Sequence, residues 1–278
     1  MSPTLVVLLA VAAGAFIGLS LGALGGGGSI LAVPVLLALG ETPAQATTGS
    51  LVVVGITSLA GAVTARRAGQ VLLARGVAFG VVAIAGAVVG ARASTAVSEP
   101  VLLAAFAGLM LVVAGLMTMR QVRSRRVAPG AARVDRPRID DPIITFSPTF
   151  MCQCPRALKV LVTATAVGLL TGFLGVGGGF LVVPALTLAL ALPMGYAAGT
   201  SLVVITITSA AALVTRAGSG IAPDWWLVAA LTVTAVAGSV AGARLAAGTD
   251  TRRLSATFTG LVLAVAAYTA VLALPALT

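Results

Sequence analysis

The sequence has no histidine, only two cysteines and little charge of either sign. Without histidine, the chain lacks the most common side-chain general base and the most common transition-metal ligand. Its two cysteines, Cys152 and Cys154, are too few for a closed zinc site, and whether they have a redox role stays open. Charged residues make up 9% of the chain, whereas a soluble globular domain has about 25%. We therefore expect neither an enzyme nor a resident cofactor or metal, and no soluble domain.

Acidic residues are scarce, and none falls in the middle of an apolar segment. The chain has seven of them: Glu41, Glu99, Asp135, Asp140, Asp141, Asp224 and Asp250. A relay of carboxylates buried at membrane depth, as in proton pumps, is therefore not predicted. Glu41 comes closest to an apolar segment, and it is interpreted either as a solvated loop residue or as a coupling residue.

What the chain does have is a series of apolar segments separated by short polar breaks. Hydrophobic residues make up 59% of the chain, and its mean hydropathy is +1.13. The pattern gives ten segments: 4–24, 29–40, 44–65, 75–97, 101–119, 158–174, 179–192, 196–215, 225–247 and 254–277. Two helix starts are marked in the sequence: Ser98 is an N-cap before Pro100, and Asp224 with two tryptophans is typical of a start at the membrane interface. These features predict an all-α polytopic membrane protein.

The first and second halves of the chain resemble each other. Three blocks align in the same order: 18–34 with 168–184, 47–64 with 198–215, and 86–92 with 238–244. The first block reads GLSLGALGGGGSILAVP in one half and GLLTGFLGVGGGFLVVP in the other. An internal duplication of this kind is typical of secondary transporters, which bind substrate where the repeats meet.

The duplication divides the chain into an N-terminal transmembrane repeat (1–119), a linker (120–157) and a C-terminal transmembrane repeat (158–278). Segments 29–40 and 179–192 are short, because they span roughly 18–21 Å as helices and the hydrocarbon core is about 30 Å thick. We interpret both as re-entrant helices that return after a full first span. Each repeat then has five segments, and an odd number predicts that the repeats are inverted in the membrane.

Positive charge lies in loops rather than in a patch suited to nucleic acid. Of the 17 basic residues, nine fall between Arg120 and Lys159. The loop at 66–75 has three arginines, and the loop at 249–253 in the other half has two. By the positive-inside rule, we expect the linker and loop 66–75 in the cytoplasm and both termini outside.

Each repeat has a run of glycines within its apolar sequence, where each glycine weakens a helix by about 1 kcal/mol. The runs and the residues that follow them are Gly25, Gly26, Gly27, Gly28, Ser29 and Pro34 in the first repeat, and Gly175, Gly177, Gly178, Gly179 and Pro184 in the second. A helix that begins after such a break presents free N–H groups and the positive end of its dipole, which suits an anion. The alternative is that the glycines only allow close helix packing.

Hydroxyl side chains and a matched pair of arginines complete the candidate site. The hydroxyls that follow the short segments are Thr48 and Ser50 in the first repeat and Thr200 and Ser201 in the second, with Thr57, Ser58, Thr206, Thr208 and Ser209 further along. They are suited to donate to a bound oxyanion, or they bond to the preceding helical turn. Arg92 and Arg244 each end a GAR motif, and they either attract an anion into a vestibule or extend to the lipid headgroups.

These motifs resemble the sulfite exporter TauE/SafE family of membrane transporters. The resemblance rests on LGGGGSILAVPVL and LGVGGGFLVVPAL, on the TGSL and GTSL that follow them and on the paired GAR, and it covers the chain except the linker. It implies a permease for a small anion, often sulfite or another organosulfur oxyanion, in a bacterial cytoplasmic membrane. Carried over by position, the family motif points to Gly25, Gly27, Gly28, Pro34, Gly175, Gly177, Gly178 and Pro184. The repeats differ where Gly26 faces Val176 and Ser29 faces Gly179, so the half-sites need not contribute equally.

We therefore expect a secondary transporter that moves a small anion, sulfite or a related organosulfur oxyanion, across the inner membrane by alternating access. Its expected partners are the anionic substrate and the lipid bilayer, without nucleic acid and without a cofactor. Two other functions stay open: a sodium-coupled importer of a small carboxylate or other solute, and a non-transporting scaffold subunit. The sequence predicts no oligomeric state.

Overall fold

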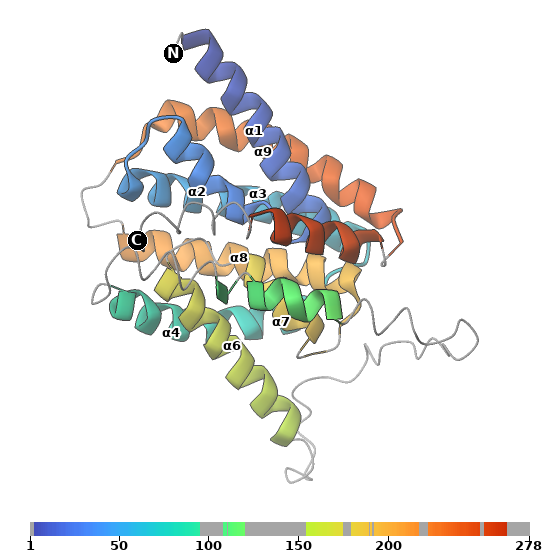
Figure 1. The fold of residues 1–278 in the computed structure, drawn as a ribbon. Helices are drawn as coiled ribbons and strands as arrows, with labels where there is room; N and C mark the ends of the chain where they lie inside the picture. The colour runs from blue at the N-terminus through green and yellow to red at the C-terminus, as the bar shows by residue number, and fades with distance from the viewer. Residues whose placement is uncertain are drawn as a thin grey trace.

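The fold is all-helical in the part of the chain that the structure describes. The computed structural model describes residues 3–94, 108–109, 111–119, 154–174, 179–188, 190, 192–216, 222–250 and 253–265, and this part contains no strand. Its helices are α1 (Pro3–Leu24), α2 (Ser29–Ala38), α3 (Pro43–Arg67), α4 (Leu73–Ser94), a stretch at 111–119, α6 (Cys154–Leu174), α7 (Gly179–Leu188), α8 (Met194–Arg216), α9 (Trp225–Ala247) and Arg253–Val265 (Figure 1). The prediction of an all-α protein is confirmed.

Helix length separates two classes of helix. Among the residues that the structure describes, four stretches are long and apolar enough to cross a membrane: Ala44–Arg67, Leu73–Gly90, Met194–Arg216 and Trp225–Ala247. Helices α2 and α7 have ten residues each. A helix of that length spans about 15 Å, so neither one crosses a hydrocarbon core about 30 Å thick.

Local signals fix the start of two long helices. Thr42 caps α3 in a capping box with Gln45, and Pro43 occupies the first turn. Asp224 caps α9, and its carboxylate accepts from the backbone N–H groups of Trp226 and Leu227 at 3.0 and 3.4 Å. The helix start predicted at Asp224 is confirmed, whereas the N-cap predicted at Ser98 lies outside the described residues.

The long helices pack through small residues that let two backbones approach closely. Four pairs of helices run parallel, because two contacts between them follow the same order along both helices. The contacting residues are Gly18–Ala235 and Gly22–Ser239 for α1 with α9, Gly168–Ala83 and Gly172–Ala87 for α6 with α4, Gly49–Val228 and Gly61–Ser239 for α3 with α9, and Gly76–Thr200 and Gly80–Ile207 for α4 with α8. The first two sets consist of aligned residues, since Gly18 aligns with Gly168 and Ala235 with Ala83. Each repeat therefore contributes its first helix to the same kind of contact with the other repeat.

Helices α3 and α8 cross in opposite directions at the centre of the molecule. Gly55 of α3 lies against Ser209, whereas Gly61, further along α3, lies against Leu202, which is earlier in α8. Together with the parallel pairs, this contact gives two groups: α1, α3 and α9 run one way, and α4, α6 and α8 run the other way (Figure 1).

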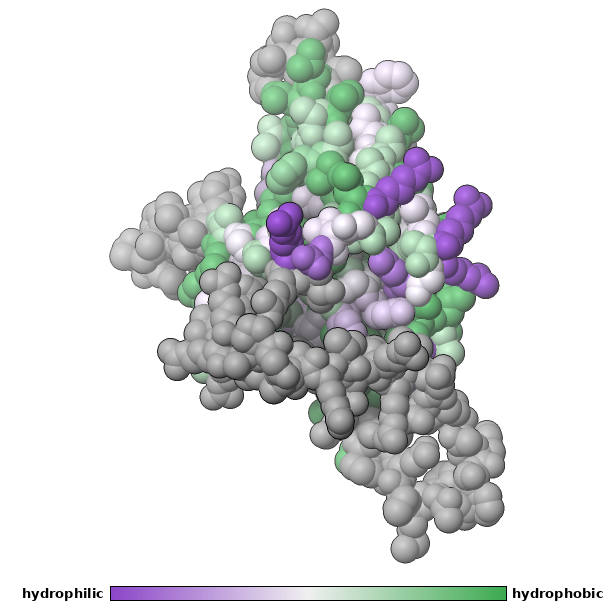
Figure 2. Space-filling model, turned by 90° about the vertical axis from the view of Figure 1, so that its right-hand side faces the viewer, coloured by the Kyte–Doolittle hydropathy of each residue, from purple (hydrophilic) through white to green (hydrophobic). Residues whose placement is uncertain are grey.

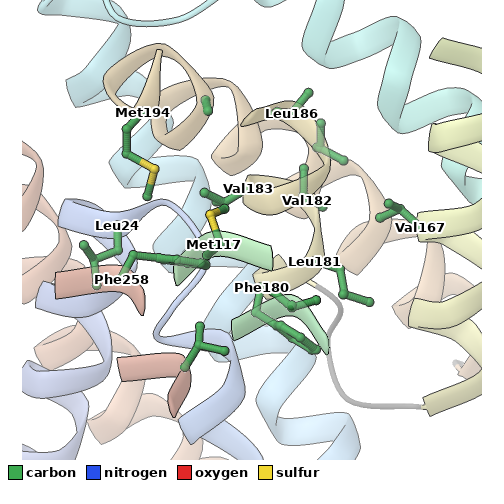
Figure 3. Close-up of a cluster of buried hydrophobic side chains, with 14 of the residues drawn as sticks. Leu24, Met117, Val167, Phe180, Leu181, Val182, Val183, Leu186, Met194 and Phe258 are labelled. Carbon is green, nitrogen blue, oxygen red and sulfur yellow. The ribbon is translucent and has the colours of Figure 1, made fainter. Parts of the chain in front are cut away.

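The short helix α7 lies in the largest buried apolar cluster. Figure 3 shows its side chains packed among those of other segments, and the labelled residues are Phe180, Leu181, Val182, Val183 and Leu186 of α7, with Leu24, Met117, Val167, Met194 and Phe258 around them. Apolar burial of this extent holds the start of α7 in place among the long helices.

The two ends of the helix bundle differ in charge. At one end, which we call the arginine end, lie Arg66, Arg67, Arg75, Arg244 and Arg253, at the ends of α3 and α9 and the starts of α4 and the helix after α9. Figure 2 looks onto this end and shows hydrophilic side chains gathered among apolar ones. At the opposite end, which we call the Glu41 end, Glu41, Arg216 and Asp224 lie at the corners joining α2 to α3 and α8 to α9.

Candidate functional site

The first glycine run reverses the direction of the chain. Gly25 has a φ of +73°, a left-handed conformation that ends α1, and its N–H bonds to the carbonyl oxygen of Leu21 at 2.8 Å. Three residues later, Gly28 packs directly against the backbone of Ile17 and against Leu21. Helix α2 therefore returns along α1, as the interpretation of segment 29–40 as re-entrant requires.

The first glycine break lies against the start of α7, the helix that follows the second glycine run. Gly26 contacts the backbone of Gly179 and Phe180, at the start of α7, so closely that a Cβ atom has no room there. Gly179 in turn lies beside the hydroxyl oxygen of Ser29, at the start of α2. The starts of both short helices therefore meet in the buried interior, because Ser29 and Gly179 are both buried.

Several backbone N–H groups of the first glycine break have no backbone acceptor in the described part of the chain. No backbone carbonyl in the described part of the chain accepts a hydrogen bond from the N–H groups of Gly26, Gly27 or Gly28. Gly28 is the N-cap of α2, and no side chain caps this helix. The N-terminal end of α2 thus presents free N–H groups and a positive dipole end in apolar surroundings.

Two carbonyl groups of the same break, those of Gly26 and Gly28, accept hydrogen bonds from the start of α2. The carbonyl oxygen of Gly26 accepts from the N–H of Ser29 at 3.2 Å and from its hydroxyl at 2.7 Å. That of Gly28 accepts from the N–H of Leu31 at 3.1 Å. The break therefore offers mainly hydrogen-bond donors to a ligand, which favours an anion over a cation.

Ser201 of α8 connects the second repeat to the first break. Its hydroxyl lies 2.5 Å from the carbonyl oxygen of Gly25 and 2.7 Å from that of Ala198, in its own helix. Gly25 also packs against the backbone of Ala198. Because Ser201 is fully buried, this contact fixes α8 against the end of α1 away from water.

Three of the predicted hydroxyls, those of Thr48, Ser50 and Thr200, do not gather at this point. Thr48 and Ser50 each bond to a backbone carbonyl in the preceding turn of α3, at 3.0 and 2.8 Å. Thr48 also accepts from the guanidinium of Arg216 at 3.4 Å, at the Glu41 end. Thr200 accepts from the N–H of Leu72 at 3.1 Å, at the arginine end. These contacts place Thr48 and Thr200 near opposite ends of the bundle.

The remaining candidate residues lie at the edge of the site or outside the described residues. Gly27 faces the side chain of Leu261, and Pro34 and Pro184 lie within α2 and α7. Arg244 is exposed in the last turn of α9, apart from the buried break. The candidates outside the described residues are Gly175, Gly177 and Gly178, together with the side chain of Arg92.

The buried charge among the described residues lies at the Glu41 end of the bundle. Among the described residues, Glu41 is the one buried charged side chain, at 9% exposure. One of its carboxylate oxygens accepts from the N–H of Asp224 at 2.7 Å, and its other oxygen has no hydrogen-bond partner. Beside it, the side-chain amide of Gln45 donates to the carbonyl oxygen of Ala222 at 3.0 Å. Glu41 is therefore not a solvated loop residue, because it ties the corner between α2 and α3 to the start of α9.

Two contacts of the site, those made by Gly26 and Ser239, were not predicted from the sequence. The family motif carried over by position does not include Gly26, which faces Val176 in the second repeat, yet Gly26 makes the direct contact with the second repeat. Ser239 of α9 was also not singled out, although it lies against Gly22, just before the break, and against Gly61 of α3. Its alignment with Ala87 was the available signal, since a hydroxyl replaces an apolar residue at a packing position.

Comparison with known proteins decides the family. Residues 10–269 match the sulfite exporter TauE/SafE family. The chain belongs to this family. Two relatives from Xylella fastidiosa are each named "Probable membrane transporter protein". The relative from strain 9a5c is 30% identical, and the alignment covers 94% of both chains. The relative from strain Temecula1 is 31% identical, and the alignment covers 72% of this chain and 69% of the relative. No solved structure matches the chain.

The family match bears on the predictions made from the sequence. As a member of the TauE/SafE family with several long apolar helices, the protein is a multi-pass membrane transporter, and the predicted resemblance is confirmed. The family assignment is consistent with a protein that is not an enzyme. In the described part of the chain, no three metal-ligating side chains lie together.

Proposed function

We propose that this protein is a secondary transporter that moves a small oxyanion, sulfite or a related organosulfur anion, across the cytoplasmic membrane of a bacterium by alternating access. The observation that carries this proposal is the contact between the two glycine breaks, where Gly26 meets Gly179 and the N–H groups of Gly26–Gly28 have no backbone acceptor in the described part of the chain. Buried polar groups without partners are costly, so donors held free at such a point suit a ligand that accepts hydrogen bonds.

The chemistry of the break supports an anion rather than sodium. A sodium site at a broken helix uses exposed carbonyl oxygens, and the carbonyl oxygens of Gly25, Gly26 and Gly28 each already accept a hydrogen bond. The start of α2 instead offers N–H donors and a positive dipole end, without a basic side chain among the buried described residues. Because its donors carry no formal charge, the site is suited to bind a small oxyanion and also to release it.

The helix directions support inverted repeats. The aligned helices α1 and α6 run in opposite directions, as do α3 and α8, and α4 and α9. With α2 and α7 as returning segments, each repeat crosses the membrane in the opposite sense to the other. The arginine end is then the cytoplasmic end by the positive-inside rule, with the linker entering α6 on that side. Rocking of one repeat against the other around the Gly26–Gly179 contact exposes the site to each side in turn.

Flux through the purified protein tests this function and identifies the anion. The protein is reconstituted in vesicles, and uptake of sulfite, thiosulfate, a sulfonate and a carboxylate is measured at two pH values, with and without a sodium gradient. We expect saturable flux of at least one sulfur oxyanion that does not require sodium. Flux of a carboxylate alone, driven by sodium, contradicts the proposal, and so does the absence of flux for every compound.

A further inference from the structure

Two hydroxyl side chains in the middle of α3 are buried and have no hydrogen-bond partner among the residues that the structure describes. Thr57 and Ser58 are both fully buried, at 0% exposure. Neither the Oγ1 atom of Thr57 nor the Oγ atom of Ser58 makes a hydrogen bond within the described part of the chain. A buried hydroxyl left without a partner loses stability, so two neighbouring ones call for a physical reason.

The rest of α3 shows that this arrangement is not imposed by the helix. Thr48, Ser50 and Thr64 lie on the same helix, and each bonds to a backbone carbonyl in the preceding turn, at 2.8–3.0 Å. That bond is the usual way in which an apolar helix satisfies a hydroxyl. Thr57 and Ser58, between Ser50 and Thr64, do not use it. In the described part of the chain, their hydroxyls are therefore not committed to a protein acceptor and can donate to another group.

Ser58 lies on a face of α3 whose neighbouring residues pack in the apolar cluster that supports the first glycine break. It lies one turn from Val54 and one turn from Ala62, and both of these residues pack in a cluster with Ile17 and Leu21 of α1. Gly28, the N-cap of α2, packs directly on Ile17 and Leu21. The face of α3 that carries Ser58 thus packs on the same part of α1 as the residue that begins α2.

Thr57 lies where α3 meets α9 and the end of α1. The hydroxyl of Ser239 donates to the backbone carbonyl of Thr57 at 3.2 Å, and the backbone of Ser239 lies against Gly22, three residues before Gly25. Gly61, one turn along α3, lies against both Ser239 and Leu202. Since Leu202 directly follows Ser201, this contact joins Thr57 to the segment of α8 that bonds to Gly25.

We infer that Thr57 and Ser58 are the side-chain part of the substrate site, and that their hydroxyls donate to the oxygen atoms of the oxyanion whose other donors are the N–H groups of Gly26–Gly28. The inference rests on the proposed function. It deepens that function by assigning a neutral site: recognition comes from O–H and N–H donors alone, since no basic residue is buried in the described part of the chain. Hydrogen bonds to a charged acceptor are stronger than those between neutral groups, so two hydroxyls suffice to change affinity measurably.

The test removes both hydroxyls with little change in shape. The variant T57V/S58A is reconstituted beside wild type and beside Thr64→Val, whose hydroxyl bonds only to its own helix. We expect the KM for the transported sulfur oxyanion to rise at least about tenfold in T57V/S58A, with little change in Vmax, and to stay at the wild-type value in Thr64→Val. We also expect the shift in melting temperature that sodium sulfite produces in wild type to be lost.

The outcomes separate this inference from the proposed function. Because the replaced hydroxyls have no hydrogen-bond partners in the described part of the chain, the melting temperature of T57V/S58A without substrate should equal or exceed that of wild type. Wild-type flux with an unchanged KM in T57V/S58A overturns the hydroxyl site and leaves the transport function standing. An altered sodium dependence with an unchanged KM for the anion assigns the hydroxyls to a cation and also overturns it. If wild type carries no anion at all, the proposed function fails first.

Discussion

The hydroxyl group of Ser201, in the second repeat, lies 2.5 Å from the carbonyl oxygen of Gly25, in the first. Gly25 is the residue whose left-handed conformation ends α1, and Ser201 lies in the central helix α8. A single hydrogen bond thus joins the point where the chain reverses to the helix that crosses the middle of the bundle. When one repeat moves against the other, this hydrogen bond must either break or keep Ser201 and Gly25 moving together.

Substitution of Ser201 by alanine tests the importance of that bond. Removal of the hydroxyl leaves the buried carbonyl oxygen of Gly25 with one partner fewer, which destabilises the fold by about 1 kcal/mol. We expect Ser201→Ala to lower the melting temperature in detergent and to reduce flux several-fold. Thr64→Val is the matched control, because it also removes a hydroxyl from an apolar helix but one that bonds within its own turn. Equal stability and flux in both variants count against a role for this bond.

The hydrogen bond from the N–H of Asp224 to the carboxylate of Glu41 predicts a closed gate at the Glu41 end. Glu41→Ala removes the acceptor for that N–H and leaves the bond from Gln45 to Ala222 as the other polar connection there. We expect the start of α9 to separate from α3 more often, whereas Glu41→Gln, which keeps a carbonyl oxygen as acceptor, should behave closer to wild type.

Accessibility of a buried reporter measures this opening. In a background with Cys152→Ser and Cys154→Ser, Ala46→Cys places a thiol at a position that is fully buried among α2, α3 and α9. Its reaction with a membrane-impermeant maleimide should become several-fold faster in Glu41→Ala. It should not change in Asp250→Ala, which removes an exposed carboxylate at the arginine end. An unchanged rate in Glu41→Ala shows that Glu41 does not hold the gate.

Inverted repeats with the arginine end in the cytoplasm predict which loops face which side. Ala68 follows α3 at the arginine end, and Ala222 precedes α9 at the Glu41 end; both are exposed. In the same background without native cysteines, Ala222→Cys should react with an impermeant thiol reagent in intact cells. Ala68→Cys should react only after the membrane is permeabilised. Labelling of both positions from one side contradicts the inverted arrangement.

The helices and the breaks could be predicted from the sequence because their causes are local. Runs of apolar residues predicted the helical segments, Asp224 predicted the start of α9, and the glycines predicted the end of α1. In these cases the side chain or backbone conformation of one residue decides the local structure. The short lengths of α2 and α7 followed in the same way from the spacing of polar and apolar residues.

The contacts of the site could not be predicted, since they depend on how distant helices pack. Thr64 and Thr57 are the same residue type on one helix, yet only Thr64 bonds to its preceding turn. Alignment of the repeats suggested equal roles for Ser50 and Ser201, whereas only Ser201 reaches across to Gly25 in the described structure. Symmetry in sequence therefore identified the right region but not the residues within it that meet.

The central claim is that the two glycine breaks together form the substrate site, and flux in Gly26→Ala tests it most directly. A methyl group at Gly26 collides with the backbone of Gly179 and Phe180, so it forces the two breaks apart. Gly195→Ala is the matched control, because a methyl group at that helical position meets nothing within 4 Å. In reconstituted vesicles, with expression and melting temperature checked in parallel, we expect flux of the sulfur oxyanion to be lost in Gly26→Ala and kept in Gly195→Ala. Wild-type flux in a folded Gly26→Ala protein contradicts the claim.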